Sequence, residues 1–81
     1  MVSKKEKTKP INMTRYPINT INILEVAYDE ENKILEIEFK LDAIHNYFEV
    51  PLDEFVAFMK ADDIEEFYFN FIQCKYHFDV F

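Results

Sequence analysis

The sequence predicts a small α+β domain in which a three-stranded antiparallel meander sheet is followed by two helices packed on one face of that sheet. Three observations support this prediction. Apolar and polar side chains alternate along residues 34–41, apolar residues recur at helical spacing from Leu52 onward, and the connections between elements are very short. Because a short connection cannot carry the chain across a sheet, successive strands are expected to be antiparallel. The helices then cover the apolar face of the sheet.

Length and composition limit the chain to one folded domain. It has 81 residues, of which 49% are hydrophobic, including nine Phe and five Tyr, enough for one small core. Residues 1–10 are rich in lysine and end at a proline, so we expect a disordered basic tail there and a single domain over residues 11–81. Glycine is absent, which excludes phosphate-binding loops and dinucleotide-binding turns, because both need backbone that carries no Cβ.

The charge is distributed unevenly along the chain. Residues 1–10 contain four lysines and one glutamate and so carry +3, which means that the net charge of −7 leaves −10 on residues 11–81. An acidic surface repels phosphate backbones and attracts basic partners. Cys74 is the only cysteine, and the lysines near Met1 are not followed by an apolar run. We therefore expect a cytoplasmic protein that does not enter a membrane, and the acidic charge counts against direct binding of nucleic acid.

Two strands are predicted in the first half of the chain. Residues 21–28 are rich in β-branched side chains and place Leu24, Val26 and Tyr28 on one face. Residues 34–41 alternate as a strand with one buried face and one solvated face must. The predicted buried face is Leu35, Ile37, Phe39 and Leu41, and the solvated face is Glu36, Glu38 and Lys40.

A third strand is predicted over residues 43–50, after a tight turn in which Asp42 can take a left-handed conformation. One face of this strand is Ile44, Asn46, Phe48 and Val50, and the other is His45, Tyr47 and Glu49. The second set is the more polar one. We therefore expect His45 and Tyr47 to lie on the more polar side of the strand with their polar tips in water.

The second half of the chain is predicted to be helical. Pro51 ends the third strand and suits the first turn of a helix over residues 51–61. Asp63 can cap a second helix, with Glu66 in the position of a capping box. The sequence FYFNF also alternates, so residues 67–76 have a strand as their alternative. The cap and the acidic first turn favour the helix.

A set of spaced residues resembles the pattern of a known family. The set is Asn22, Tyr28, Asp29, Leu35, Phe39, Tyr47, Val50, Pro51, Ala61, Ile72 and Tyr76. It is similar to the KTSC domain, a family named for its occurrence at the C-terminus of some lysyl-tRNA synthetases and found also as a stand-alone bacterial and phage protein. The resemblance covers about residues 18–78. It implies a small α+β fold and brings with it the family's suggested role in RNA binding.

The departures from the family pattern fall at polar and glycine positions. The central Tyr-x-Tyr of the family is His45-Asn46-Tyr47 in this chain, and its Ser-x-Gly turn is Asp63-Ile64-Glu65. Ala27 and Asp42 stand where the family has glycine, and Phe69 stands where it has asparagine. Such positions would build a shared site or turn, so the resemblance implies the fold more strongly than the function.

The candidate partner-binding residues combine an aromatic pair, a set of acids and one surplus phenylalanine. They are His45, Tyr47, Glu49, Asp62, Asp63, Glu65, Glu66 and Phe69. Phe58, Phe78 and Phe81 also fall outside the faces assigned to the core, and exposed apolar groups tend to mark contacts with partners. Cys74 and His77 have a spacing that zinc accepts, but no second pair of ligands follows them, so we expect neither a metal nor a cofactor.

These features favour a non-catalytic protein-interaction module whose acidic surface binds a basic surface of another protein. The most specific form of this hypothesis is a phage or mobile-element inhibitor of a nucleic-acid-handling protein, because carboxylates can imitate the spacing of phosphates. The alternative is an RNA- or tRNA-associated accessory domain that uses Tyr47, His45 and the basic tail. A homodimer that buries the surplus aromatics is also open. The sequence shows no nucleophile with an orienting partner, so we do not expect an enzyme.

Overall fold

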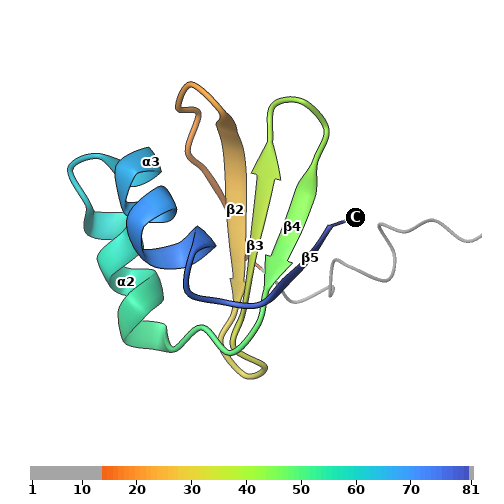
Figure 1. Cartoon of the computed structure of the whole chain (residues 1–81), viewed down its shortest axis with the longest axis vertical. Helices are drawn as coiled ribbons and strands as arrows, with labels where there is room; N and C mark the ends of the chain where they lie inside the picture. Colours follow the sequence, from red (N-terminus) through yellow and green to blue (C-terminus); the bar gives the residue numbers. More distant parts are fainter. Residues whose placement is uncertain (1–13, 81) are drawn as a thin grey trace, which may run out of the picture.

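The computed structural model describes residues 14–80 and shows an α+β domain in which helices cover one face of an antiparallel sheet (Figure 1). Within those residues the sheet has five strands in the order β1-β2-β3-β4-β5. The strands are β1 (Thr14–Pro17), β2 (Ile23–Asp29), β3 (Ile34–Phe39), β4 (Ile44–Tyr47) and β5 (Phe78–Val80). The helices are α2 (Leu52–Lys60), α3 (Ile64–Phe67) and a π-helix, η1 (Tyr68–Gln73). The predicted tail over residues 1–10 lies outside the described residues.

The prediction of an α+β fold is confirmed, but the prediction of three strands is wrong because a short strand is added at each edge. Strand β1 pairs with β2 from Thr14 opposite Tyr28 to Pro17 opposite Glu25. The prediction missed this strand because it contains Pro17. An edge strand tolerates proline, because the missing N–H can face solvent instead of a neighbouring strand. Strand β5 has only three residues, too few to show alternation, and pairs with β4 through Phe78 opposite Tyr47.

The second helix is confirmed, and residues 67–73 do not form the alternative strand. Asp63 caps the helix, since its side chain accepts a hydrogen bond of 3.1 Å from the backbone N–H of Glu66. Helix α3 continues without a break into η1, because Phe67 and Tyr68 both have helical backbone angles. The first helix also matches its prediction closely and ends at Lys60, with Ala61 as its C-cap. None of the helices within residues 14–80 is long and apolar enough to cross a membrane.

The core lies between the sheet and the helices. Its most deeply buried members are Ile23, Val26, Leu35, Ile37, Tyr47, Val50, Phe58, Tyr68 and Ile72. Phe58 was predicted to fall outside the core, but it is 0% exposed, because α2 turns it toward the sheet together with Phe55. Phe78 is partly buried against the same core, whereas Phe81 lies outside the described residues.

The predicted faces of the third strand are reversed in the structure. Tyr47 pairs with Leu35, which pairs with Tyr28, so these three side chains share the helix-covered face. His45 shares that face for the same reason, since it lies opposite Ile37. The polarity of His45 and Tyr47 made the prediction wrong, because the His45 Nδ1 and the Tyr47 hydroxyl have partners within the domain.

Two predicted strand positions also leave the core. A bulge between Ile23 and Glu25 shifts the register of β2, so Ile23 is buried while Leu24 is 42% exposed. Strand β3 ends at Phe39, and Leu41 projects from the following turn with 91% of its side chain exposed. That turn has the predicted left-handed residue, Asp42, at φ 68°.

Candidate functional site

The strongest candidate site is a groove at the end of the sheet where β3 turns into β4. Three exposed apolar side chains line it, Ile21 at 85% exposure, Leu41 at 91% and Phe69 at 50%. Ile21 precedes β2, Leu41 lies in the β3–β4 turn and Phe69 lies on η1, so three distant segments build one surface. We call this surface the apolar groove. Its volume is about 510 Å³, and large exposed apolar groups that gather in this way mark contact sites.

The floor of the apolar groove includes Phe39, His45 and Tyr68. The His45 ring stacks on Phe78, with centroids 4.9 Å apart and an interplanar angle of 11°, and meets Phe39 edge-on at 4.8 Å. Its Nδ1 lies 3.1 Å from the Tyr47 hydroxyl, which in turn forms a hydrogen bond with the Tyr68 hydroxyl. These contacts fix the rings, so the floor is preformed.

The floor is also electrically neutral near pH 7. Burial lowers the pKa of His45, which keeps its imidazole uncharged. Burial raises the pKa of Tyr47, and the hydrogen bond to Tyr68 adds to this effect. Burial raises the pKa of Tyr68 as well, although its bond to Tyr47 acts in the opposite direction. A neutral aromatic floor favours apolar ligands over ions.

An acidic rim adjoins the apolar groove. Asp63, Glu65 and Glu66 line a shallow depression of about 540 Å³ that shares Ile21 and Phe69 with the groove. The acids gather there because the α3 N-terminus, where carboxylates are favoured, lies beside η1. Asp62 borders the next depression together with Asp63 and Glu66.

The Glu65 carboxylate lies in the acidic rim, but it is engaged in hydrogen bonds within the domain. Its carboxylate accepts hydrogen bonds from the Thr20 hydroxyl at 2.5 Å, from the Asn22 backbone N–H at 2.5 Å and from the Asn22 side-chain amide at 3.0 Å. The bond from Thr20, followed by those from Asn22, lowers the pKa of Glu65. Glu65 thus ties the loop that carries Ile21 to helix α3 and holds one wall of the groove in place.

The structure brings most of the predicted partner-binding residues to one end of the molecule, with two exceptions. His45 and Phe69 line the apolar groove, and the acids of residues 62–66 lie next to it. Tyr47 is 0% exposed and cannot touch a partner, and Glu49 lies beyond the opposite end of β4 with a left-handed φ of 60°. The sequence analysis did not identify Ile21 and Leu41 as site residues, because it placed both of them within predicted strands. Their positions next to predicted turns were the only sign in the sequence that they could be exposed.

Cys74 and His77 remain apart from the groove floor and are both exposed. The Cys74 thiol donates a hydrogen bond of 3.0 Å to the carbonyl oxygen of Asn70 within the same helical segment. Over residues 14–80, no three His, Cys, Asp or Glu side chains come together in a way that could hold a metal ion.

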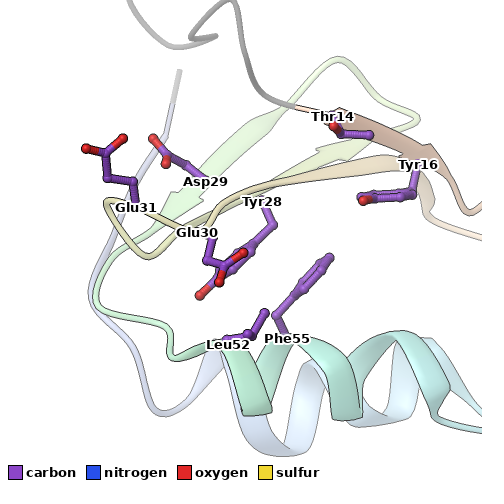
Figure 2. Close-up of a pocket in the computed structure, with 8 residues that line it drawn as sticks. All are labelled: Thr14, Tyr16, Tyr28, Asp29, Glu30, Glu31, Leu52 and Phe55. Carbon is purple, nitrogen blue, oxygen red and sulfur yellow. The ribbon is translucent and has the colours of Figure 1, made fainter.

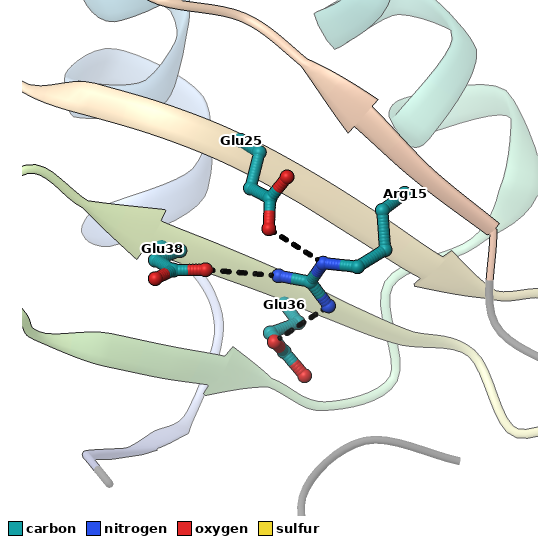
Figure 3. Close-up of polar contacts among 4 residues, drawn as sticks. All are labelled: Arg15, Glu25, Glu36 and Glu38. Carbon is teal, nitrogen blue, oxygen red and sulfur yellow. Dashed lines mark hydrogen bonds and ion pairs between the residues drawn. The ribbon is translucent and has the colours of Figure 1, made fainter. Parts of the chain in front are cut away.

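A second group of acids is committed to the opposite face of the sheet. Figure 3 shows the Arg15 guanidinium between three glutamates, with Nε 2.7 Å from Glu25, one terminal nitrogen 3.0 Å from Glu36 and the other 3.2 Å from Glu38. Burial disfavours the charge on Arg15, but the bonds to Glu25 and Glu36 outweigh it and raise the pKa of Arg15. These carboxylates contact Arg15 on the sheet, so they do not belong to the acidic rim.

The fold and the groove together define a small α+β domain with one preformed apolar surface. The family model of the KTSC domain matches residues 19–76, so the chain belongs to the KTSC domain family. The chain is 33% identical to an uncharacterized protein of Stutzerimonas stutzeri strain A1501. The match spans 52 residues, which are 64% of this chain and 73% of that protein. The chain is also similar to the crystal structure of a KTSC domain protein from Yersinia pestis, with a TM-score of 0.81, 30% identity, and coverage of 85% of this chain and 97% of the other.

The family membership predicted from the sequence is therefore confirmed, and the structure explains which residues carried it. Tyr28, Leu35, Tyr47, Val50 and Ile72 are all buried at 8% exposure or less. The Tyr28 hydroxyl donates a hydrogen bond of 2.5 Å to the carbonyl oxygen of Val50, which holds the end of β2 against the segment that leads into α2. The resemblance thus rests on the core of the domain.

Proposed function

We propose that this chain is a non-catalytic interaction module that binds a protein segment with apolar and basic side chains in the apolar groove. The observation that carries the proposal is the exposure of Ile21 and Leu41. Among the described residues they are the most exposed of the large apolar side chains, and both lie on the same groove as Phe69. Such a cluster has the composition of the buried centre of a protein interface.

The expected gain from covering the groove is large enough to matter. Full burial of a leucine or isoleucine side chain contributes about 1.5–3 kcal/mol to the free energy of binding. The loss of translational and rotational entropy on association offsets part of this gain. Ile21 and Leu41 begin almost fully exposed, so each can contribute most of that amount. Because the floor rings are already fixed by their mutual contacts, little further ordering is needed when a partner binds.

The acidic rim determines the kind of partner. Asp62, Asp63 and Glu66 are exposed beside the groove, and the whole chain has a net charge of −7. Charges at the edge of an interface mainly speed association and select partners of opposite sign. A partner segment with Lys or Arg next to its apolar residues therefore complements this surface. A cytoplasmic site of action agrees with the single thiol of the chain.

The most specific form of the proposal is that the partner handles nucleic acid and that a phage or mobile element encodes this module as its inhibitor. The acidity and small size of the chain support it, because proteins that bind nucleic acid present basic surfaces. Contact between this module and such a surface would compete with phosphate backbones.

A non-catalytic role is supported by the residues that line the groove. His45 is its one imidazole among the described residues, and the groove lining there contains no Ser, Thr or Cys that the imidazole could activate and no carboxylate that could orient it. The alternative of an RNA-associated domain loses its main aromatic residue, because Tyr47 is fully buried and cannot stack on a base.

Affinity capture with matched variants tests the proposal. Leu41→Asp places a charge in the groove, and Val56→Asp places the same charge on α2, where Val56 is 37% exposed and outside the groove lining. We expect the wild-type chain and Val56→Asp to retain the same basic proteins from a bacterial lysate, and Leu41→Asp to lose them. Binding should also weaken as salt is added. Retention that Leu41→Asp does not change would contradict the proposal.

The same samples test the two alternatives. Material that ribonuclease releases, and that a chain without residues 1–10 no longer retains, would favour the RNA-associated domain. Dimerisation of the wild-type chain that Leu41→Asp abolishes, measured by sedimentation, would mean that the groove binds a second copy.

A further inference from the structure

A second concave site lies at the other end of the sheet, between β1 and the start of α2. It is a cleft of about 360 Å³, within the size range of small-molecule sites. Its aromatic walls are Tyr16, Tyr28 and Phe55, and Thr14, Leu52 and Glu30 complete the rim together with the rest of the β2–β3 turn (Figure 2). We call it the aromatic cleft. The apolar groove shares none of these residues.

The rings of the aromatic cleft are held in fixed positions. Tyr28 and Phe55 stack with centroids 4.3 Å apart and an interplanar angle of 7°. The Tyr28 hydroxyl is anchored on the Val50 carbonyl, so this stack cannot rotate freely. Tyr16 lies across from Phe55 at 6.1 Å with a tilt of 45° and keeps 38% of its surface exposed. Tyr16 is therefore the ring that presents most surface to solvent, and the buried Tyr28–Phe55 stack lies behind it.

The charges around the aromatic cleft are negative. Figure 2 shows the Glu30 carboxylate beside the Tyr28 ring, while the side chains of Asp29 and Glu31 point away from the rings. Asp29 is occupied by Asn32, which donates hydrogen bonds to it from its backbone at 3.1 Å and its side chain at 2.8 Å. Burial, and then the charges of Glu30, Asp29 and Asp53, raise the pKa of Tyr28. Glu30 is thus the exposed carboxylate whose charge acts most strongly on Tyr28.

The Arg15 guanidinium and the N-terminus of α2 do not cancel this field. Arg15 neighbours Tyr16 in the chain, but its guanidinium lies on the opposite face of the sheet among Glu25, Glu36 and Glu38 (Figure 3). The N-terminus of α2 carries a partial positive charge, and Asp53 and Glu54 in its first turn offset it.

We propose that the aromatic cleft binds a methylated ammonium group between Tyr16 and Glu30. Ring faces attract a cation through their quadrupole, and a carboxylate at the rim adds a direct charge interaction. A methylated ammonium suits these walls better than a bare one, because its methyl groups can pack on a ring face and it has fewer N–H groups that must find acceptors. A neutral apolar ligand would gain nothing from Glu30. This inference does not depend on the function proposed for the apolar groove.

The test is a titration of the full chain with choline, in which binding is monitored through the NMR chemical shifts of the backbone amides. The matched probe is 3,3-dimethyl-1-butanol, which has the same shape without the charge. We expect choline to shift amides of residues 14–16, 28–31 and 52–55, and the neutral alcohol to bind at least several-fold more weakly. Choline that causes no localised shift, or equal binding of the two probes, would overturn the proposal.

Matched variants assign the binding to the two named side chains. Tyr16→Leu should weaken choline binding by about tenfold, whereas Tyr16→Phe, which keeps the ring, should retain it. Glu30→Gln should weaken it by about two- to fivefold, and Glu66→Gln, which removes the same charge at the other end of the molecule, should not. All three substituted sites are exposed, so the amide spectrum outside the cleft reports that the fold is intact. Equal effects of Glu30→Gln and Glu66→Gln would contradict a specific role for Glu30.

Discussion

Glu36 and Ile37 are neighbours in β3 and are both 0% exposed, yet different forces hold them on opposite faces of the sheet. Ile37 lies in the core beneath the helices, where the non-directional hydrophobic effect holds it in place. Glu36 lies on the other face, with one carboxylate oxygen 3.0 Å from Arg15. The alternation of apolar and polar residues therefore predicts which side chains pack in the apolar core and which make polar contacts. It does not predict whether the polar face of the strand is exposed to solvent.

The two faces should respond differently to substitution. The helix-covered face is a continuous apolar cluster, so a lost side chain leaves a cavity. On the opposite face, one arginine serves three carboxylates, so the loss of that single residue leaves buried charge without its main compensation.

The largest expected effect is on the helix-covered face. Phe58→Ala removes a fully buried ring and should lower the free energy of unfolding by about 3–5 kcal/mol, measured by urea denaturation. Phe69→Ala, at a ring that is 50% exposed, is the control and should change it by less than about 1 kcal/mol. Equal losses for the two variants would mean that Phe58 does not lie in a close-packed core.

The opposite face should show the next largest effect. Arg15→Met keeps most of the side-chain length and removes the charge, and should cost about 2–3 kcal/mol because Glu36 stays buried. Lys75→Met breaks the ion pair with Glu54 at the surface, where Lys75 is 53% exposed, and should cost clearly less stability than Arg15→Met. Both are measured by urea denaturation at neutral pH. An Arg15→Met variant as stable as Lys75→Met would show that the three-glutamate cluster does not need its arginine.

The smallest effect concerns His45, which brings a titratable group into the helix-covered face. Its folded pKa lies below the ordinary 6.5, so the unfolded chain takes up a proton first as the pH falls. The stability that comes from neutral His45 is therefore present above about pH 6.5 and declines as the pH falls toward the folded pKa. His45→Phe should flatten this part of the stability profile, measured by urea denaturation at a series of pH values. A profile unchanged in His45→Phe would contradict the burial of a neutral imidazole.

Much of the fold could be predicted, because local rules govern those parts. Alternation located the strand over residues 34–41, and Asp63 with Glu66 marked the start of the second helix. Asp42 supplied the left-handed turn. The edge strands could not be predicted, since β1 contains Pro17 and β5 is three residues long, and neither shows a period. Both form because the neighbouring strand offers unpaired backbone groups.

The candidate site could be predicted only in part. The acids of residues 62–66 and the exposure of Phe69 followed from helix periodicity and capping. Ile21 and Leu41 could not be assigned to the groove, because nothing local shows that the segment before β2 and the β3–β4 turn meet beside η1. Tyr47 was misplaced for a related reason: its hydroxyl is satisfied by Tyr68, a residue 21 positions away in the chain.

By itself, the sequence determined the α+β class, the KTSC pattern, the helix starts and the acidity of the domain, because each depends on residue identity or on neighbours within one turn or strand. The tertiary structure alone decided which face of β4 is covered, where the sheet ends, and that three exposed apolar residues share one groove. Those outcomes depend on strand register and helix docking, in which groups distant along the chain satisfy one another.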